Sequence, residues 1–167
     1  LPLATICLAG AASPGPSLAV VLGAAVGAGR TAGLAAAWAH AAGVGIYAAA
    51  TVAGISVLVT GAPAVFNILQ VAGALYLLWL ARNLLRQRGA AAVDSAAPDH
   101  RDAARNGFAI AFLNPKLAVF MLALFSQFVR PGAGAVDSVI LVATATLIDG
   151  LWYSLVAMLV SRPRWLA

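Results

Sequence analysis

Apolar residues dominate the chain in five long runs, which short stretches of turn-forming or charged residues separate. The runs cover residues 1–28, 32–60, 63–85, 107–129 and 136–160. Each run is long enough for a membrane-spanning helix of about 20 residues. Closed membrane barrels need strands of about 10 residues with alternating apolar and polar positions, and the runs show no such alternation. The pattern predicts an all-α integral membrane protein with five transmembrane helices.

The connections between the runs differ in length. Three are short and have turn chemistry, near Gly29, Gly61 and Pro131, whereas residues 87–105 form a long polar loop. The end of this loop is expected to give the fourth helix a short amphipathic start. The chain begins inside an apolar run and stops where another helix could begin. We therefore expect five helices of a total of six within a single transmembrane domain, residues 1–167.

Composition supports a membrane protein. The chain is 63% hydrophobic and 9% charged, against roughly 25% charged residues in a soluble domain. Its mean hydropathy is +0.96. The ten basic residues are scattered, which argues against a nucleic-acid surface and for the excess of basic residues that marks cytoplasmic loops. The single cysteine excludes an internal disulfide.

The distribution of arginine predicts the orientation. If the 87–105 loop is cytoplasmic, eight arginines lie inside, at positions 30, 82, 86, 88, 101, 105, 162 and 164. Only Arg130 then lies outside. This bias places the N-terminus outside the cell and the loop in the cytoplasm.

Two apolar runs are interrupted by helix breakers. Pro14, Gly15 and Pro16 break the first run, and Asn114-Pro115-Lys116 breaks the fourth. Proline in a helix interior costs about 3 kcal/mol, and lysine at membrane depth costs about 2.5–3.5 kcal/mol on insertion scales. Features this costly usually mark a functional site.

The two interruptions belong to similar short sequences. Residues 16–20 recur as residues 115–119 with four of five positions matching. Since three spans precede the second copy, the copies must have opposite orientation. The sequence thus predicts an inverted 3+3 repeat, about 1–86 and about 106–167, with interrupted first and fourth helices, the arrangement typical of secondary transporters.

Both breaks are predicted to lie near the middle of the bilayer, where the N-termini of two half-helices would face each other. Each N-terminus carries about half a positive charge and unpaired N–H groups. Together with Lys116 and the residues around the first break, Ser17 included, they would form an anion site suited to a carboxylate.

Four further polar residues lie within apolar runs. Asp149 is the only acid away from the ends of these runs, and Lys116 is its expected partner. Asp149 would carry a coupling proton, hold a substrate ammonium group, or only fix the helix packing. His40 is a proton relay or a packing histidine, and Tyr47 and Gln70 either face substrate or pack between helices.

Four motifs together resemble the LysE/RhtB family of amino-acid exporters. They are residues 13–16, 75–80, 112–116 and 125–128. The resemblance covers nearly the whole chain. It implies about six spans and export of amino acids across the plasma membrane of a bacterium. It also implies that the two breaks hold the family's signature positions, and that Asp149 takes an acidic position of the fifth helix.

The sequence therefore predicts a secondary transporter that exports amino acids or similar small zwitterionic metabolites by proton antiport. An anion-selective channel with a lysine filter and a membrane scaffold without transport are the alternatives. The paired breaks favour alternating access.

The expected partners are an amino acid, protons and membrane lipids, with a homo-oligomer left open. No Ser/His/Asp set, histidine pair or phosphate-binding glycine loop is found in the sequence, so we expect no enzyme, metal or cofactor and no nucleic-acid partner.

Overall fold

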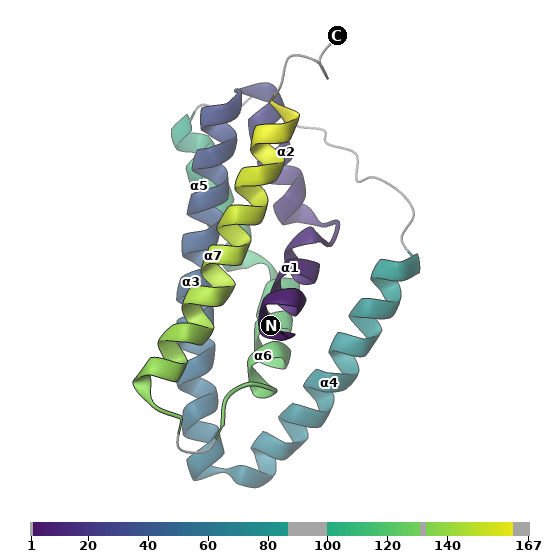
Figure 1. Cartoon of the computed structure of the whole chain (residues 1–167), viewed down its shortest axis with the longest axis vertical. Coiled ribbons are helices and arrows are strands. Elements are labelled where there is room, and N and C mark those ends of the chain that lie inside the picture. Colours follow the sequence, from purple (N-terminus) through teal and green to yellow (C-terminus); the bar gives the residue numbers. More distant parts are fainter. Residues whose placement is uncertain (1, 87–99, 131–132, 162–167) are drawn as a thin grey trace.

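The computed structural model describes residues 2–86, 100–130 and 133–161, and these residues form seven helices and no strand (Figure 1). The helices are α1 (Pro2–Ala12), α2 (Pro16–Gly27), α3 (Arg30–Gly61), α4 (Pro63–Arg86), α5 (His100–Leu113), α6 (Pro115–Ser126) and α7 (Ala135–Val160). The all-α prediction is confirmed. Most of the predicted polar loop, residues 87–99, lies outside the described residues.

The predicted interruptions of the first and fourth apolar runs are confirmed. Helices α1 and α2 meet at an angle of 65°, and α5 and α6 at 58°. Both second halves begin with proline, Pro16 in α2 and Pro115 in α6. Proline suits the first turn of a helix because its missing N–H would have no partner there, but it cannot continue the helix before it. Each proline therefore ends one half-helix and starts the next.

Length and composition make several of these helices candidate membrane spans. Residues Arg30–Ile55 of α3 and all of α7 qualify alone, and counting each bent pair as one span raises the number to four. Helix α4 occupies the remaining apolar run, and its stretch Pro63–Ala72 is apolar but shorter. The sixth helix and the inverted repeat stay predictions.

Helix boundaries differ from the ends of the apolar runs, most of all at the start of α5. Helix α5 begins at His100 instead of Gly107. Its first turns bury Ala103 and expose Arg101 and Asp102, so the predicted amphipathic start is confirmed. Helix α3 continues to Gly61, which leaves only Ala62 between α3 and α4.

Helix α3 is the centre of the packing, and it contacts α2, α4, α5, α6 and α7. Small residues allow the close approach: a Cβ at Gly107 of α5 would lie 2.3 Å from the Ala36 carbonyl oxygen of α3. Helix α4 lies at one side of the molecule, against α6 and α3 (Figure 1). Small residues at such contacts are typical of helices packed in a bilayer.

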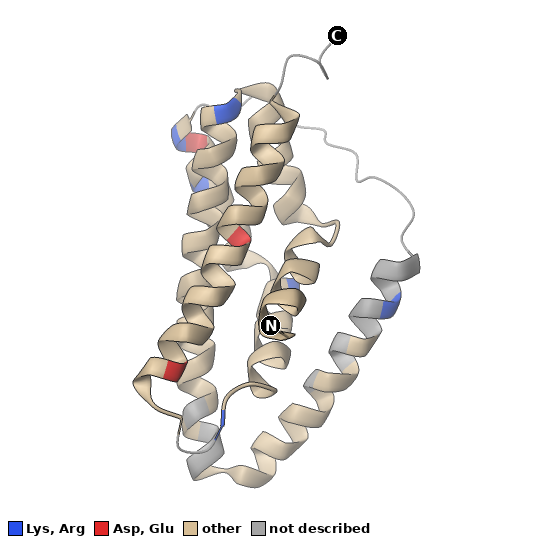
Figure 2. Cartoon of the chain, viewed as in Figure 1, with Lys and Arg blue, Asp and Glu red and all other residues tan. Residues whose placement is uncertain are grey.

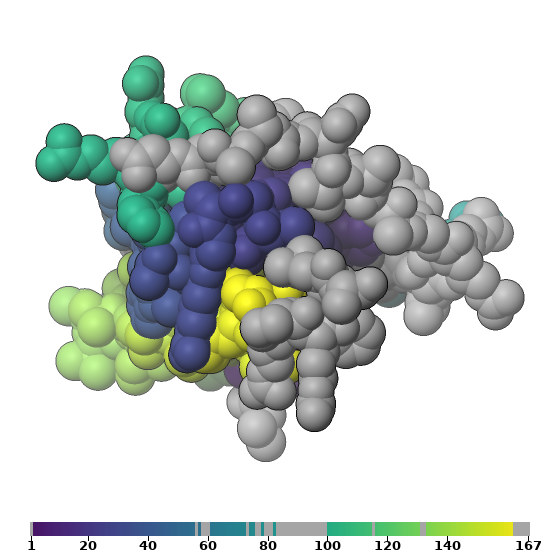
Figure 3. Space-filling view, turned by 90° about the horizontal axis from the view of Figure 1, so that it is seen from above, coloured from purple at the N-terminus to yellow at the C-terminus, as the bar shows by residue number. Residues whose placement is uncertain are grey.

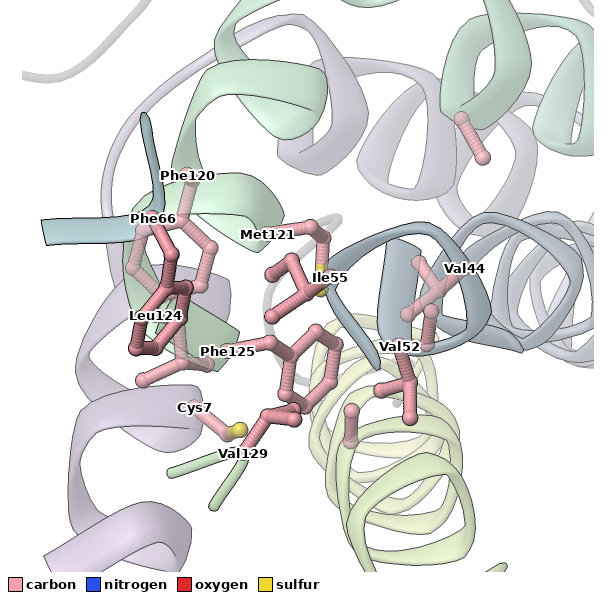
Figure 4. Close-up of a cluster of buried hydrophobic side chains, with 13 residues drawn as sticks. Cys7, Val44, Val52, Ile55, Phe66, Phe120, Met121, Leu124, Phe125 and Val129 are labelled. Carbon is pink, nitrogen blue, oxygen red and sulfur yellow. The ribbon is translucent and has the colours of Figure 1, made fainter. Parts of the chain in front are cut away.

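The buried apolar side chains form two clusters. The first cluster, shown in Figure 4, consists of Cys7, Val44, Ala48, Val52, Ile55, Phe66, Ala111, Phe120, Met121, Leu124, Phe125, Val129 and Ala145. The second consists of Val21, Ala24, Ala25, Ala32, Ala36, Ala37, Ala103, Tyr153 and Ala157. Large apolar side chains of α4 and α7, such as Ile68 and Leu151, are exposed, as expected of surfaces that face lipid.

The described arginines are distributed unevenly between the two ends of the molecule. Basic residues gather at the end where α3 and α5 begin (Figure 2), which is also the end of α7 (Figure 3). Arg30, Arg101 and Arg105 lie in these first turns and are exposed, whereas Arg130 follows α6. This division agrees with the predicted sorting of arginines.

Candidate functional site

The two helix breaks are hydrogen-bonded to each other. Lys116 Nζ of the second break donates to Ser13 Oγ of the first at 2.5 Å. Asn114 Nδ2 donates to Ser17 Oγ at 3.3 Å. Residues about a hundred positions apart are thus joined by two side-chain contacts, and the predicted meeting of the breaks is confirmed.

The local sequence explains how each half-helix starts. Asn114 caps α6, because its Oδ1 accepts a hydrogen bond from the Lys116 backbone N–H at 3.0 Å. Helix α2 has Gly15 at the corresponding position, with no side-chain cap. A Cβ at Gly15 would lie 3.7 Å from Lys116 Nζ, so a larger side chain would approach the ammonium group. The starts of α2 and α6 and the lysine charge therefore form one electropositive region.

A cavity of about 50 Å³ lies beside this contact. Its wall comes from α1, both breaks, α3, α6 and α7, and from members of both apolar clusters. The lining residues are Cys7, Gly10, Ala11, Ser13, Gly15, Pro16, Ser17, His40, Asn114, Lys116, Leu117, Phe120, Met121, Ala145, Asp149 and Tyr153. At about 10–15 Å³ for each water, this space holds a few water molecules. A whole amino acid would need the surrounding helices to separate.

Asp149 pairs with His40 on the neighbouring helix. The distance from His40 Nδ1 to Asp149 Oδ2 is 2.7 Å, and the two residues are 1% and 6% exposed. Asp149 thus pairs with His40, and Lys116 Nζ donates to Ser13 instead, so the expected partnership of Lys116 with Asp149 is corrected.

Helix packing explains the change of partner. Helices α3 and α7 come close because Gly150 leaves room for Trp38 and Ala41, which brings His40 to Asp149. Lys116 lies on α6 and is held by Ser13 of the first break. Tyr153, one turn after Asp149, packs edge-on against the His40 ring with centroids 5.1 Å apart.

The second ring nitrogen of His40 lies in a different environment. Nε2 is buried and has no hydrogen-bond partner in the structure, although the residue lines the cavity. Buried polar atoms nearly always have a partner, either in the protein or in bound water. Among the described residues, Nε2 shares this lack of a partner with Trp152 Nε1 and Ser154 Oγ.

Comparison with known proteins identifies the family. The family model described as LysE type translocator matches residues 8–166. The chain belongs to this family. The model's description is that of a translocator, and the long apolar helices of the chain agree with a multi-pass membrane protein.

Named relatives of this LysE family chain are efflux proteins of bacteria. A leucine efflux protein of Enterobacter sp. (strain 638) is 30% identical over 138 residues, which are 80% of this chain and 65% of that protein. A threonine efflux protein of Salmonella typhi is 28% identical over 158 residues, 91% of this chain and 77% of that protein. The chain thus spans slightly less than two thirds of the first of these relatives. No solved structure matches significantly.

The cavity brings together most of the residues predicted from the LysE family resemblance and from the polar positions. Gly15, Pro16, Ser17, His40, Asn114, Lys116 and Asp149 all line it. Pro14 does not, and the Pro115 side chain is outside the described part of the chain, although Pro115 starts α6.

Tyr47 and Gln70 lie away from the cavity. The Tyr47 ring packs against Phe112, with centroids 5.8 Å apart. The backbone carbonyl oxygen of Gln70 accepts a hydrogen bond from Gln127 Nε2 at 2.7 Å. Both residues connect helices in this structure, and neither is among the lining residues.

Sequence reasoning missed several lining residues. Ser13 belongs to the first break and binds the lysine, and Tyr153 lies four residues after Asp149 on the same helix face. These two positions could have been found from their spacing. Cys7, Gly10 and Phe120 carry no polar signal, and only the tertiary packing brings them to the cavity.

Proposed function

We propose that this LysE family protein is a secondary transporter that exports amino acids, or similar small zwitterions, by proton antiport. The family is one of translocators, and the named relatives are efflux proteins for leucine and threonine. The proposal covers the activity, the substrate class, the coupling ion and the location in the bacterial plasma membrane.

The observation that carries the proposal is the junction of the two helix breaks at Lys116. Its ammonium group and the N-terminal turns of α2 and α6 face one cavity. Backbone N–H groups at a helix start and a nearby cation together bind carboxylates and phosphates. The carboxylate of an amino acid would bind at this junction.

The opposite charge lies in the same cavity. Asp149 and His40 line it from α7 and α3, where they can accept hydrogen bonds from an ammonium group. A cavity with one cation and one carboxylate is complementary to a zwitterion, because it offers an opposite charge to each end. In an anion channel, the Asp149 carboxylate would repel the permeating anion.

The proposed cycle is alternating access. The chain is proposed to form one transporter domain with inverted repeats, about 1–86 and about 106–167, whose interrupted helices move relative to each other around the site. The N-terminus would lie outside and the 87–105 loop in the cytoplasm. The small volume of the cavity suits a state between the two open ones.

Export of a labelled amino-acid panel from cells expressing the protein tests the proposal. We expect Lys116→Met to lower export of the preferred substrate roughly 10- to 150-fold, because a hydrogen bond to a charged group contributes about 1.5–3 kcal/mol. Arg130→Gln also removes one positive charge, but from an exposed position outside the site, and should export normally.

Near-normal export by Lys116→Met would contradict the carboxylate site. The channel alternative is tested with the same variants in proteoliposomes. Passive anion currents without substrate exchange would support a channel, whereas saturable exchange of amino acids without such currents would support a transporter.

A further inference from the structure

We propose that His40 and Asp149 form one proton-binding unit, in which His40 Nε2 binds either a proton or the ammonium group of the substrate. The inference rests on the proposed function and assigns its coupling step to a specific atom. It differs from the expectation in the sequence analysis that Asp149 alone carries the coupling proton.

With Asp149 ionised, the hydrogen bond assigns one tautomer to His40. An ionised carboxylate only accepts hydrogen bonds, so Nδ1 must carry the proton that it donates to Asp149 Oδ2 across 2.7 Å. In the neutral ring, Nε2 then has a free lone pair. The carboxylate also orients the ring, as carboxylates do for histidines that act as metal ligands or proton acceptors.

Nε2 belongs to a residue that lines the cavity and lacks a hydrogen-bond partner among the described residues. The residue is 1% exposed, Nε2 has no partner, and His40 lines the cavity that also contains Lys116. If His40 served only to pack α3 against α7, a hydrogen bond at Nε2 or an apolar side chain would stabilise the fold better. A proton or a substrate ammonium group would supply the partner that Nε2 lacks among the described residues.

The proposed reaction is a proton transfer without other bond changes. A proton from water adds to the Nε2 lone pair and gives an imidazolium beside the Asp149 carboxylate. The net charge of the unit changes from −1 to 0, and release to water on the other side reverses the step. A substrate ammonium group donates an N–H to the same lone pair, so proton and substrate exclude each other. Mutual exclusion at one atom produces antiport.

The pH response would involve every titratable group around the unit. These are Cys7 on α1, Lys116 on α6 and Tyr153 on α7, which all line the cavity. Ser17 of α2 and Asn114 between α5 and α6 complete the polar wall and do not titrate. Variants at His40 itself separate its contribution from those of the other groups.

His40→Asn tests the proposal in proteoliposomes. The asparagine amide can replace Nδ1 as the donor to Asp149, but it does not titrate. We expect exchange of labelled amino acid at saturating substrate to continue, with the half-saturation concentration raised about tenfold by the lost bond to the ammonium group. Uphill transport driven by a pH gradient should be abolished, and the pH dependence of the half-saturation concentration should fall to the part that Cys7, Lys116 and Tyr153 contribute.

Nuclear magnetic resonance can follow the protonation of His40 Nε2 directly. The chain has two histidines, so His100→Gln leaves His40 alone. His100 starts α5 at the arginine-rich end, away from the cavity lining. In nuclear magnetic resonance spectra of ¹⁵N-histidine-labelled protein, the Nε2 signal should change from the protonated to the unprotonated form as pH rises. Addition of the transported amino acid at low pH should drive the same change.

The outcomes distinguish this inference from the proposed function. If the unaltered protein exchanges no amino acid, the proposed function fails. If it does exchange and couples to protons, but His40→Asn still gives full pH-driven accumulation, only the present inference fails. An Nε2 signal that ignores both pH and substrate would also overturn the inference, and this measurement does not depend on whether His40→Asn folds.

Discussion

At the scale of single residues, the pair of His40 and Asp149 is the feature that most constrains the core. Both side chains are buried, and each provides a hydrogen-bond partner for the other. Removing one partner of a buried pair generally costs about 3–5 kcal/mol, because the other is left without compensation. We therefore expect the pair to affect stability as well as the proposed transport.

We expect Asp149→Leu to lower the thermal stability of the purified protein, and adding His40→Leu to restore most of the loss. Adding Lys116→Met should not restore it, since Lys116 is bound to Ser13. Asp149→Asn is the matched control, because its amide oxygen still accepts from His40. Thermal unfolding in detergent measures each variant, and a rescue by Lys116→Met would show that the lysine is the partner after all.

Gly10 and Phe120 offer a second prediction at this scale. A Cβ at Gly10 would lie 2.6 Å from Phe120 Cζ, and both residues line the cavity. Gly10→Ala should displace the ring and lower export, most strongly for the larger members of the amino-acid panel. Adding Phe120→Leu should relieve the clash and restore export of these larger amino acids. A Cβ at Gly134 meets no atom within 4 Å, so Gly134→Ala should leave export of both small and large amino acids unchanged. Equal effects on small and large substrates would contradict a steric role.

At the scale of helices, the close contact of α3 and α5 depends on Gly107. A Cβ there would overlap the Ala36 carbonyl oxygen, and a backbone atom cannot rotate away. We expect Gly107→Ala to destabilise the protein by about 1–3 kcal/mol, as overpacking typically does. Gly54→Ala on α3 meets no atom within 4 Å and should be neutral or slightly stabilising. Melting temperatures of the two variants test this, and equal stability would mean that the helices can separate at no cost.

The helices also show what the sequence can and cannot predict. The breaks before Pro16 and Pro115 were predictable because proline acts locally on its own helix. The amphipathic start of α5 was predictable for the same reason, from the spacing of its polar and apolar residues. The partner of Asp149 was not, because it depends on which helix packs beside α7. The lining role of Cys7 and Phe120 likewise depends on tertiary contacts.

At the scale of the whole molecule, the separation of arginines predicts the orientation in the membrane. In a Cys7→Ala background, Ala62→Cys between α3 and α4 should react with an impermeant thiol reagent in intact cells. Thr31→Cys, exposed at the arginine-rich end, should react only after the cells are permeabilised. The reverse labelling pattern would invert the proposed topology and the direction of transport.

The joining of the two breaks has a consequence for biosynthesis. Ser13 and its partner Lys116 are 103 residues apart. At about 5–20 residues per second, the ribosome makes Lys116 roughly 5 to 20 s after Ser13. During this interval the first break must enter the membrane without its hydrogen-bonding partner, although hydrocarbon cannot satisfy exposed backbone groups. The nascent α1–α2 segment therefore needs water or the insertion machinery at its break until the second half of the chain arrives.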